Sequence, residues 1–161
     1  MIKIDEAAGT VTVEIDGTSE TFLLGSPEGF AVISKAWLRA GWDAKHVYTF
    51  TWLGRPIIQL PEDMIRLQET ICRVRPDVIL ETGIAHGGSA VFFASILKLL
   101  GSGRVISVDI DIREHNRAAL EGHSLKPWIT LIQGDSVAPE TIQEVRSAVG
   151  AADTIMVVLD S

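Results

Sequence analysis

The alternation of short apolar runs with helical segments limits the fold of this chain more than any other feature. Four runs rich in β-branched residues lie at 78–80, 105–108, 129–132 and 154–159, and stretches of helical length separate them. Such runs are typical of strands that are buried on both faces of a parallel sheet. Strands that alternate with helices predict a parallel sheet with right-handed crossovers. We therefore expect an α/β fold in which helices cover both faces of the sheet.

Proline and glycine residues mark the expected helices. Pro61 opens a helix whose apolar residues recur at helical spacing, and Pro76 ends it. Gly101 follows a second, strongly apolar helix. The expected helices cover 61–74, 89–100, 112–122 and 139–149.

The first part of the chain follows a different pattern. Residues 2–24 alternate apolar and polar side chains around Asp16-Gly17, which predicts a β-hairpin. Ser26-Pro27 then starts a helix to about residue 41, and 46–61 is expected to be irregular. We expect an N-terminal β-hairpin and helix at 1–47 and a sheet domain at 48–161. The apolar face of the first helix carries Phe30, Ile33, Trp37 and Leu38.

The charge of the chain disfavours two classes of partner. Its 161 residues include 14 basic and 21 acidic side chains, for a formal net charge of −7. An acidic surface repels nucleic-acid phosphates and anionic lipid. No apolar run approaches the roughly 20 residues of a membrane helix, so no membrane span is expected. Cys72 is the only cysteine and cannot form an internal disulfide, which favours a cytoplasmic location.

A glycine-rich turn, ETGIAHGGS at 81–89, follows the first strand of the expected sheet. Ligands of open parallel sheets bind beyond the carboxyl ends of the strands. Gly83 and Gly87 allow a tight turn and a close approach of the backbone to a ligand, and Ser89 is placed to cap the next helix. Ala85 breaks the G-x-G-x-x-G pattern of dinucleotide folds, and no Gly-Lys-Ser/Thr completes a P-loop. For the glycines alone, an ordinary strand-to-helix turn is an equal alternative.

Acidic and hydroxyl side chains follow the other three strands. Asp109 can accept hydrogen bonds from two ribose hydroxyls. Asp135 and Ser136 can hydrogen-bond an adenine amino group, cap the next helix, or do both. Asp160 can bind a hard metal such as Mg²⁺, position a substrate or end in solvent. Together the four turns favour a crevice that binds a nucleoside.

The residues at the strand ends resemble those of class I S-adenosylmethionine-dependent methyltransferases: Glu81, Gly83, Gly87, Ser89, Asp109, Asp135, Ser136 and Asp160. More narrowly, the chain is similar to the cephalosporin hydroxylase-like family, which includes rhamnosyl O-methyltransferases. The segments WLGRPIIQLPED at 52–63 and VISVDIDIR at 105–113 carry that similarity. It implies a Rossmann-like, three-layer αβα fold of which the chain holds the N-terminal half. Trp52 and Gln59 are candidates for a lid over the cofactor.

The resemblance implies methyl transfer to a hydroxyl group of a sugar or small secondary metabolite. In metal-assisted members, the place of Asp160 belongs to a Mg²⁺ ligand, and the metal lowers the pKa of the substrate hydroxyl and orients it. The other residues bind the cofactor: its methionine part at Glu81, Gly83, Gly87 and Ser89, its ribose at Asp109, and its adenine at Asp135 and Ser136.

Two further functions stay open. The family fold normally has more strands than the four expected here, so a truncated or non-catalytic assembly module is one alternative. A family member that acts in cephalosporin-type hydroxylation or methoxylation is another, whereas the glycine spacing argues against an NAD-dependent enzyme. A sheet that ends at a central strand exposes an apolar edge, so we expect a homo-oligomer.

Overall fold

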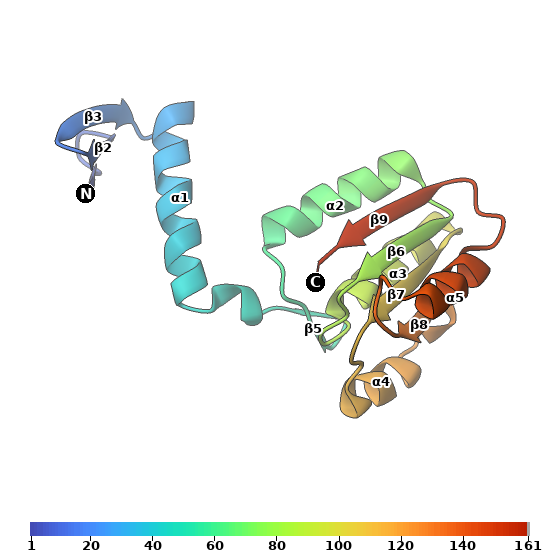
Figure 1. The fold of residues 1–161 in the computed structure, drawn as a ribbon. Coiled ribbons are helices and arrows are strands. Elements are labelled where there is room, and N and C mark those ends of the chain that lie inside the picture. Colours follow the sequence, from blue (N-terminus) through green and yellow to red (C-terminus); the bar gives the residue numbers. More distant parts are fainter. Residues whose placement is uncertain (161) are drawn as a thin grey trace. The chain divides into compact units, whose positions relative to one another are not determined.

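The structure is a computed structural model that describes residues 1–160, so Ser161 lies outside the described residues. The chain divides into two compact units, Met1–His46 and the part from Val47 onward, and each unit has a sheet of its own (Figure 1).

Three antiparallel strands form the sheet of the N-terminal unit. β1 (Ile2–Asp5), β2 (Thr10–Ile15) and β3 (Thr18–Leu23) pair in that order. The predicted hairpin turn is confirmed, because Asp16 and Gly17 have φ values of 51° and 80°, as a two-residue type I′ turn requires. The predicted two-stranded hairpin was incomplete, because β1 adds a third strand against β2.

The helix of this unit, α1 (Pro27–Asp43), begins where the sequence indicates. Ser26 Oγ accepts a hydrogen bond from Gly29 N at 3.0 Å, and Pro27 lies in the first turn. The expected apolar face is largely unpacked, since Phe30 is 69% and Trp37 44% exposed. Gly29 is the only residue of α1 that the structure buries.

A short hairpin corrects the expectation that 46–61 is irregular. A turn of 3-10 helix, His46–Tyr48, precedes β4 (Thr51–Trp52) and β5 (Arg55–Pro56). Leu53 and Gly54 join the two strands with φ values of 45° and 84°. Strands of two residues leave no detectable alternation in a sequence.

Four parallel strands form the sheet of the second unit in the order β8-β7-β6-β9 (Figure 1). They are β6 (Val78–Thr82), β7 (Arg104–Asp109), β8 (Ile129–Gln133) and β9 (Ile155–Leu159). Every pairing is parallel, as predicted. The chain passes from β6 through β7 to β8 and then returns to place β9 on the other side of β6. A reversal of strand order of this kind opens a crevice at the carboxyl ends of the strands.

Helices cover both faces of this sheet, which confirms the predicted α/β architecture. On one face, Ile71 and Leu97 join the core that includes Ile79. On the other face, Val145 packs with the buried Ile106. The helices are α2 (Pro61–Val74), α3 (Gly88–Leu100), α4 (Glu114–Glu121) and α5 (Pro139–Val149).

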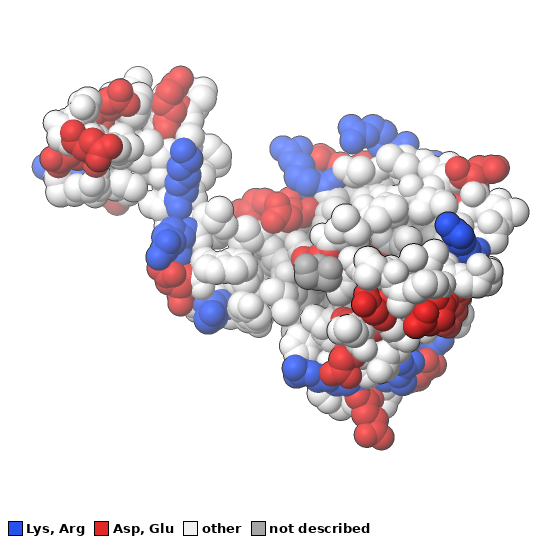
Figure 2. Space-filling view, in the orientation of Figure 1, with Lys and Arg blue, Asp and Glu red and all other residues white. Residues whose placement is uncertain are grey.

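The surface carries charges of both signs. Figure 2 shows Lys and Arg side chains interspersed with Asp and Glu on the face in view. In the described part of the chain, no helix is both long and apolar enough to cross a membrane.

Candidate functional site

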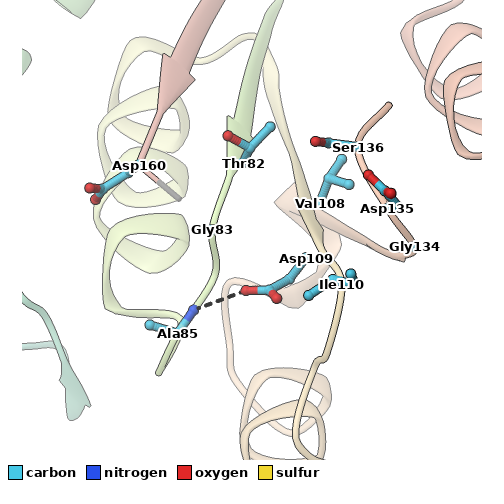
Figure 3. A pocket seen from close by; sticks show the side chains of 10 residues that line it. All are labelled: Thr82, Gly83, Ala85, Val108, Asp109, Ile110, Gly134, Asp135, Ser136 and Asp160. Atoms are coloured by element: carbon cyan, nitrogen blue, oxygen red, sulfur yellow. Dashed lines mark hydrogen bonds between the residues drawn. The ribbon is translucent and has the colours of Figure 1, made fainter. Parts of the chain in front are cut away.

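A pocket of about 400 Å³ lies at the carboxyl ends of the four parallel strands. Figure 3 shows Gly83 between Asp160 on one side and the loop of Asp135 and Ser136 on the other, with Asp109 below. The structure thus brings together five of the eight predicted site residues, one or more from the end of each strand. The full lining is Thr82, Gly83, Ala85, Val108, Asp109, Ile110, Gly134, Asp135, Ser136 and Asp160.

The glycine-rich turn is built from left-handed residues. Gly83, Ala85 and Gly87 have φ values of 89°, 45° and 81°. Gly87 does not line the pocket, and a Cβ atom there would lie 2.6 Å from Leu120 Cδ1. Gly87 is therefore required for the packing of the turn against α4, whereas Gly83 faces the pocket.

The prediction that Ser89 caps the next helix is wrong. The N-cap of α3 is Gly87, whose left-handed conformation starts the helix earlier and leaves Ser89 inside the first turn. Ser89 instead lines a second, smaller pocket of about 120 Å³ together with Gln59, His86 and Asp160.

The carboxylate of Asp109 already holds the turn. Its Oδ2 accepts hydrogen bonds from Ile84 N at 2.7 Å and Ala85 N at 3.4 Å, and its Oδ1 accepts one from Asp111 N at 3.0 Å. Figure 3 shows the contact with Ala85. Each carboxylate oxygen has two acceptor sites, so Asp109 retains capacity for a ligand hydroxyl.

Glu81 lies below the pocket and does not line it. Its side chain is fully buried in β6, and its Oε2 accepts a hydrogen bond from Ser107 Oγ at 2.7 Å. Oε1 accepts no hydrogen bond of regular geometry among the described residues. Burial raises the pKa of Glu81 to about 7, the nearby hydroxyl groups of Ser89 and Ser107 oppose this rise, and the negative charges of Asp160 and Asp109 add to it. An unsatisfied buried oxygen at this depth is a feature typical of functional sites.

The loop after β8 presents its polar groups to the pocket and does not cap a helix. Asp135 Oδ1 accepts a hydrogen bond from Val137 N at 3.0 Å, and the N-cap of α5 is Ala138. The alternative prediction that Asp135 or Ser136 caps the next helix is therefore wrong. Both side chains are exposed, which leaves them available to a ligand.

Asp160 follows β9 and lines both pockets. Its backbone N donates to Thr82 O at 3.0 Å, and its Oδ2 accepts a hydrogen bond from Gln59 Nε2 at 3.0 Å. The described residues include no group of three or more His, Cys, Asp or Glu side chains that could hold a metal ion. Within the described chain, Asp160 is thus not part of a metal-binding cluster.

Trp52 is not placed as a lid. Its Nε1 donates to Ser95 Oγ at 3.1 Å, and its ring packs edge-on against Phe92 at 5.1 Å between centroids. It therefore belongs to the packing of β4 on α3.

Two other side chains contact the glycine-rich turn and were missed from the sequence, Arg55 and Asn116. They lie 61 positions apart, so no local spacing could have revealed them.

Known proteins of one family are similar to this chain. The model of the family "Rhamnosyl O-methyltransferase/CmcI" matches residues 44–161. Rhamnosyl O-methyltransferase of Mycobacterium leprae (strain TN) is 33% identical over 99 residues, which cover 61% of this chain and 41% of that protein. The Mycobacterium tuberculosis (strain H37Rv) protein of the same name is 28% identical over 98 residues, 60% of this chain and 38% of that one. The chain thus spans about two fifths of the length of these relatives.

Solved structures of CmcI share the fold. A CmcI structure with Mg and S-adenosylmethionine has a TM-score of 0.57 at 24% identity, covering 71% of this chain and 47% of that one. A CmcI structure with S-adenosylhomocysteine has a TM-score of 0.52 at 21% identity, covering 70% and 53%. These likenesses confirm the predicted Rossmann-like methyltransferase fold.

Proposed function

The chain belongs to the rhamnosyl O-methyltransferase/CmcI family, and on this premise we propose that it binds S-adenosylmethionine and serves methyl transfer to a hydroxyl group. The observation that carries the proposal is the pocket at the strand ends, where Gly83, Asp109, Asp135 and Asp160 meet. The acceptor that we propose is a sugar or a small secondary metabolite, as the names of the rhamnosyl O-methyltransferase relatives suggest.

The polar groups of the pocket match the polar groups of this cofactor. Asp109 accepts a hydrogen bond from a ribose hydroxyl at its remaining acceptor site on Oδ1, and this hydroxyl has no negative charge to be repelled. Asp135 and Ser136 bind the adenine amino group from the neighbouring loop. The methionine part lies against Gly83 and the turn that follows it, with Gly87 shaping that turn.

Glu81 and Ser89 complete the binding of the methionine part from below. The buried Oε1 of Glu81 accepts no hydrogen bond of regular geometry, and a cationic amino group is the group that best satisfies a carboxylate oxygen in a dry site. Ser89 offers a hydroxyl group from the second pocket, which Gly83 also lines.

S-adenosylmethionine supplies the methyl group when it is bound. The protein's part is to hold the reacting oxygen in line with that methyl group and to exclude water, since positioning accounts for most of the rate gain in such transfers. We propose that Asp160 would hold Mg²⁺, a group that would supply Lewis acidity for an acceptor hydroxyl. A CmcI structure described with Mg and S-adenosylmethionine supports the proposal of a metal, whereas the choice of Asp160 rests on its place at the pocket.

A second candidate is a module that binds the cofactor without catalysing transfer. It is favoured by the donor set, because within the described residues Asp160 is accompanied by no metal-binding cluster. Turnover separates the two candidates. Methyl transfer to a panel of rhamnosides and other sugars is measured as release of S-adenosylhomocysteine, with and without Mg²⁺. Transfer supports the enzyme, and cofactor binding without transfer supports the module.

Calorimetric titration of the chain with S-adenosylmethionine tests the binding site itself. We expect saturable binding that Asp135→Ala weakens by about tenfold or more, since a hydrogen bond to a charged group contributes about 1.5–3 kcal/mol. Asp109→Ala should abolish binding, and Asp111→Ala, two residues further on and outside the main pocket, should leave it unchanged. A folded chain that does not bind, or equal losses in all three variants, would contradict the site.

We also propose that the chain forms a homodimer through β9. This strand lies at the edge of the sheet and contains no charged residue, and alternate side chains are exposed: Ile155 43%, Val157 55% and Leu159 78%. An apolar edge strand without charged side chains is a template for pairing with another strand. Two antiparallel β9 strands related by a twofold axis would extend one sheet into the other.

A further inference from the structure

Two side chains outside the main pocket hold the glycine-rich turn that faces it. Arg55 on β5 donates from Nε to His86 O at 3.0 Å, and its Nη2 donates to the same carbonyl. The Nη2 group also donates to Asn116 Oδ1 on α4 at 2.9 Å. Asn116 Nδ2 in turn donates to Ala85 O at 2.8 Å. One network therefore binds two consecutive carbonyl groups of the turn.

The burial of Asn116 and the charge of Arg55 indicate that the hydrogen bonds of this network stabilise the turn. Asn116 is 3% exposed, and its side-chain hydrogen bonds go to Arg55 and the turn. Within the described chain, Arg55 makes no ion pair with a carboxylate, so its donors serve a carbonyl and an amide. A guanidinium group can reach both acceptors at once because its donors lie in a rigid plane, which a lysine ammonium does not provide.

The turn needs such support because its backbone is strained. Ala85 has φ 45°, a left-handed conformation that residues with a Cβ rarely adopt. Strained conformations persist where the surroundings hold them. Asp109 binds the amide groups of Ile84 and Ala85, while Arg55 and Asn116 bind the carbonyl groups of Ala85 and His86. The peptide groups of the turn are thereby fixed from two sides.

We infer that Arg55 and Asn116 are positioning residues for cofactor binding, which act through the carbonyl groups of Ala85 and His86. The inference rests on the proposed function, because the turn must receive the methionine part of the cofactor for its position to matter. Neither side chain lines the main pocket, although Asn116 lines a neighbouring one beside Asp109, and the hydrogen bonds of both reach the main pocket through the turn. The hairpin of β4 and β5 is thus part of the site although it makes no contact with the main pocket.

The test compares S-adenosylmethionine with adenosine as calorimetric probes of the 161-residue chain. Arg55→Lys and Asn116→Asp should each weaken S-adenosylmethionine binding by about tenfold, the lower end of what loss of a supporting residue does at a site. Adenosine binding should change less than about twofold, because its adenine is held by the separate loop of Asp135 and Ser136. The double variant should lose no more than the stronger single variant, since both act through one turn.

Arg117→Lys is the matched control on α4. Arg117 donates to Gln133 Oε1 at 2.9 Å and does not contact the turn. Hydrogen exchange of the amide groups of 83–88 should accelerate in the Arg55 and Asn116 variants and stay as in the wild type in the control. Equal losses for both probes, or an unchanged affinity for S-adenosylmethionine, would overturn the inference. If the wild-type chain binds neither probe, the proposed function fails, and the exchange measurement still decides whether Arg55 and Asn116 hold the turn.

Discussion

The two edges of the parallel sheet have similar strands and different surroundings. β8 and β9 each have five residues, and each contributes apolar side chains to the core. In β8, Ile129 and Ile132 are buried and the exposed positions are polar, Thr130 and Gln133. In β9 the exposed positions are apolar, as described above. Helix α5 covers the core that contains Ile132, whereas the same face of β9 has no such cover in the described structure.

The comparison indicates that the composition of a strand reflects whether one or both of its faces are suited to be covered. Met156 and Val158 of β9 pack against the core on the α3 face. Successive side chains alternate between faces, so the other three side chains point to the α5 face. An all-apolar strand is typical of a position covered on both faces. β8 has the sequence of an edge strand, and β9 has the sequence of an interior one.

The substitution that should change stability most compares the two edges of the sheet directly. Ile132→Ala should lower the free energy of unfolding by about 2–5 kcal/mol, since it removes a fully buried side chain and leaves a cavity. Ile155→Ala, the same substitution on the same face of the other edge, should cost less than about 1 kcal/mol because that side chain is already 43% exposed. Urea titration followed by circular dichroism measures both. Equal losses would show that the face of β9 is covered in solution.

The next effect concerns Glu81, which faces Val158 of β9 in the register of the sheet. Its pKa rises from 4.5 to about 7 on folding, so between these values the unfolded chain has lost a proton that the folded chain keeps. The contribution of Glu81 to stability is therefore highest below pH 4.5 and falls as the pH rises to about 7, by roughly 3 kcal/mol at most.

Glu81→Gln removes this dependence and keeps an acceptor for Ser107. The variant should be more stable than the wild type at pH 8 and close to it at pH 4.5, as measured by urea titration at each pH. Subtracting the two curves cancels every other titrating group. A difference that stays constant across this range would contradict the assignment. The Glu81→Gln variant should also bind S-adenosylmethionine more weakly. Residue 81 is the proposed partner of the cofactor's amino group, and the substitution removes its charge.

Most of the second unit could be predicted from the sequence because its signals are local. Pro61, Pro139 and Gly101 mark helix ends within a residue of those observed. The strands of the parallel sheet are apolar runs rich in β-branched residues. The site residues could also be grouped from the sequence, because the carboxyl ends of parallel strands meet at one edge of the sheet and ligands bind there.

The features that were missed depend on contacts between distant segments. The N-cap of α3 is Gly87 and not Ser89, and Leu120 on α4 leaves no room for a Cβ atom at Gly87. The burial of Glu81 was also missed, because the pleat of β6 turns its side chain into the core beside Ser107. The bonds of Arg55 to His86 span 31 positions, and no periodicity records them.

The smallest expected effect on stability is also the sharpest test of the difference between the edges. Val157→Lys places a charge on the exposed face of β9, which should change the free energy of unfolding by less than about 0.5 kcal/mol. A lysine on an edge strand nevertheless opposes pairing with another strand. Light scattering over a range of concentrations should show a dimer for the wild type and a monomer for this variant. Thr130→Lys on β8 is the matched control and should remain dimeric, because that edge is already polar. A wild type that stays monomeric, or the same mass for both variants, would mean that the apolar edge of β9 does not bind a second copy.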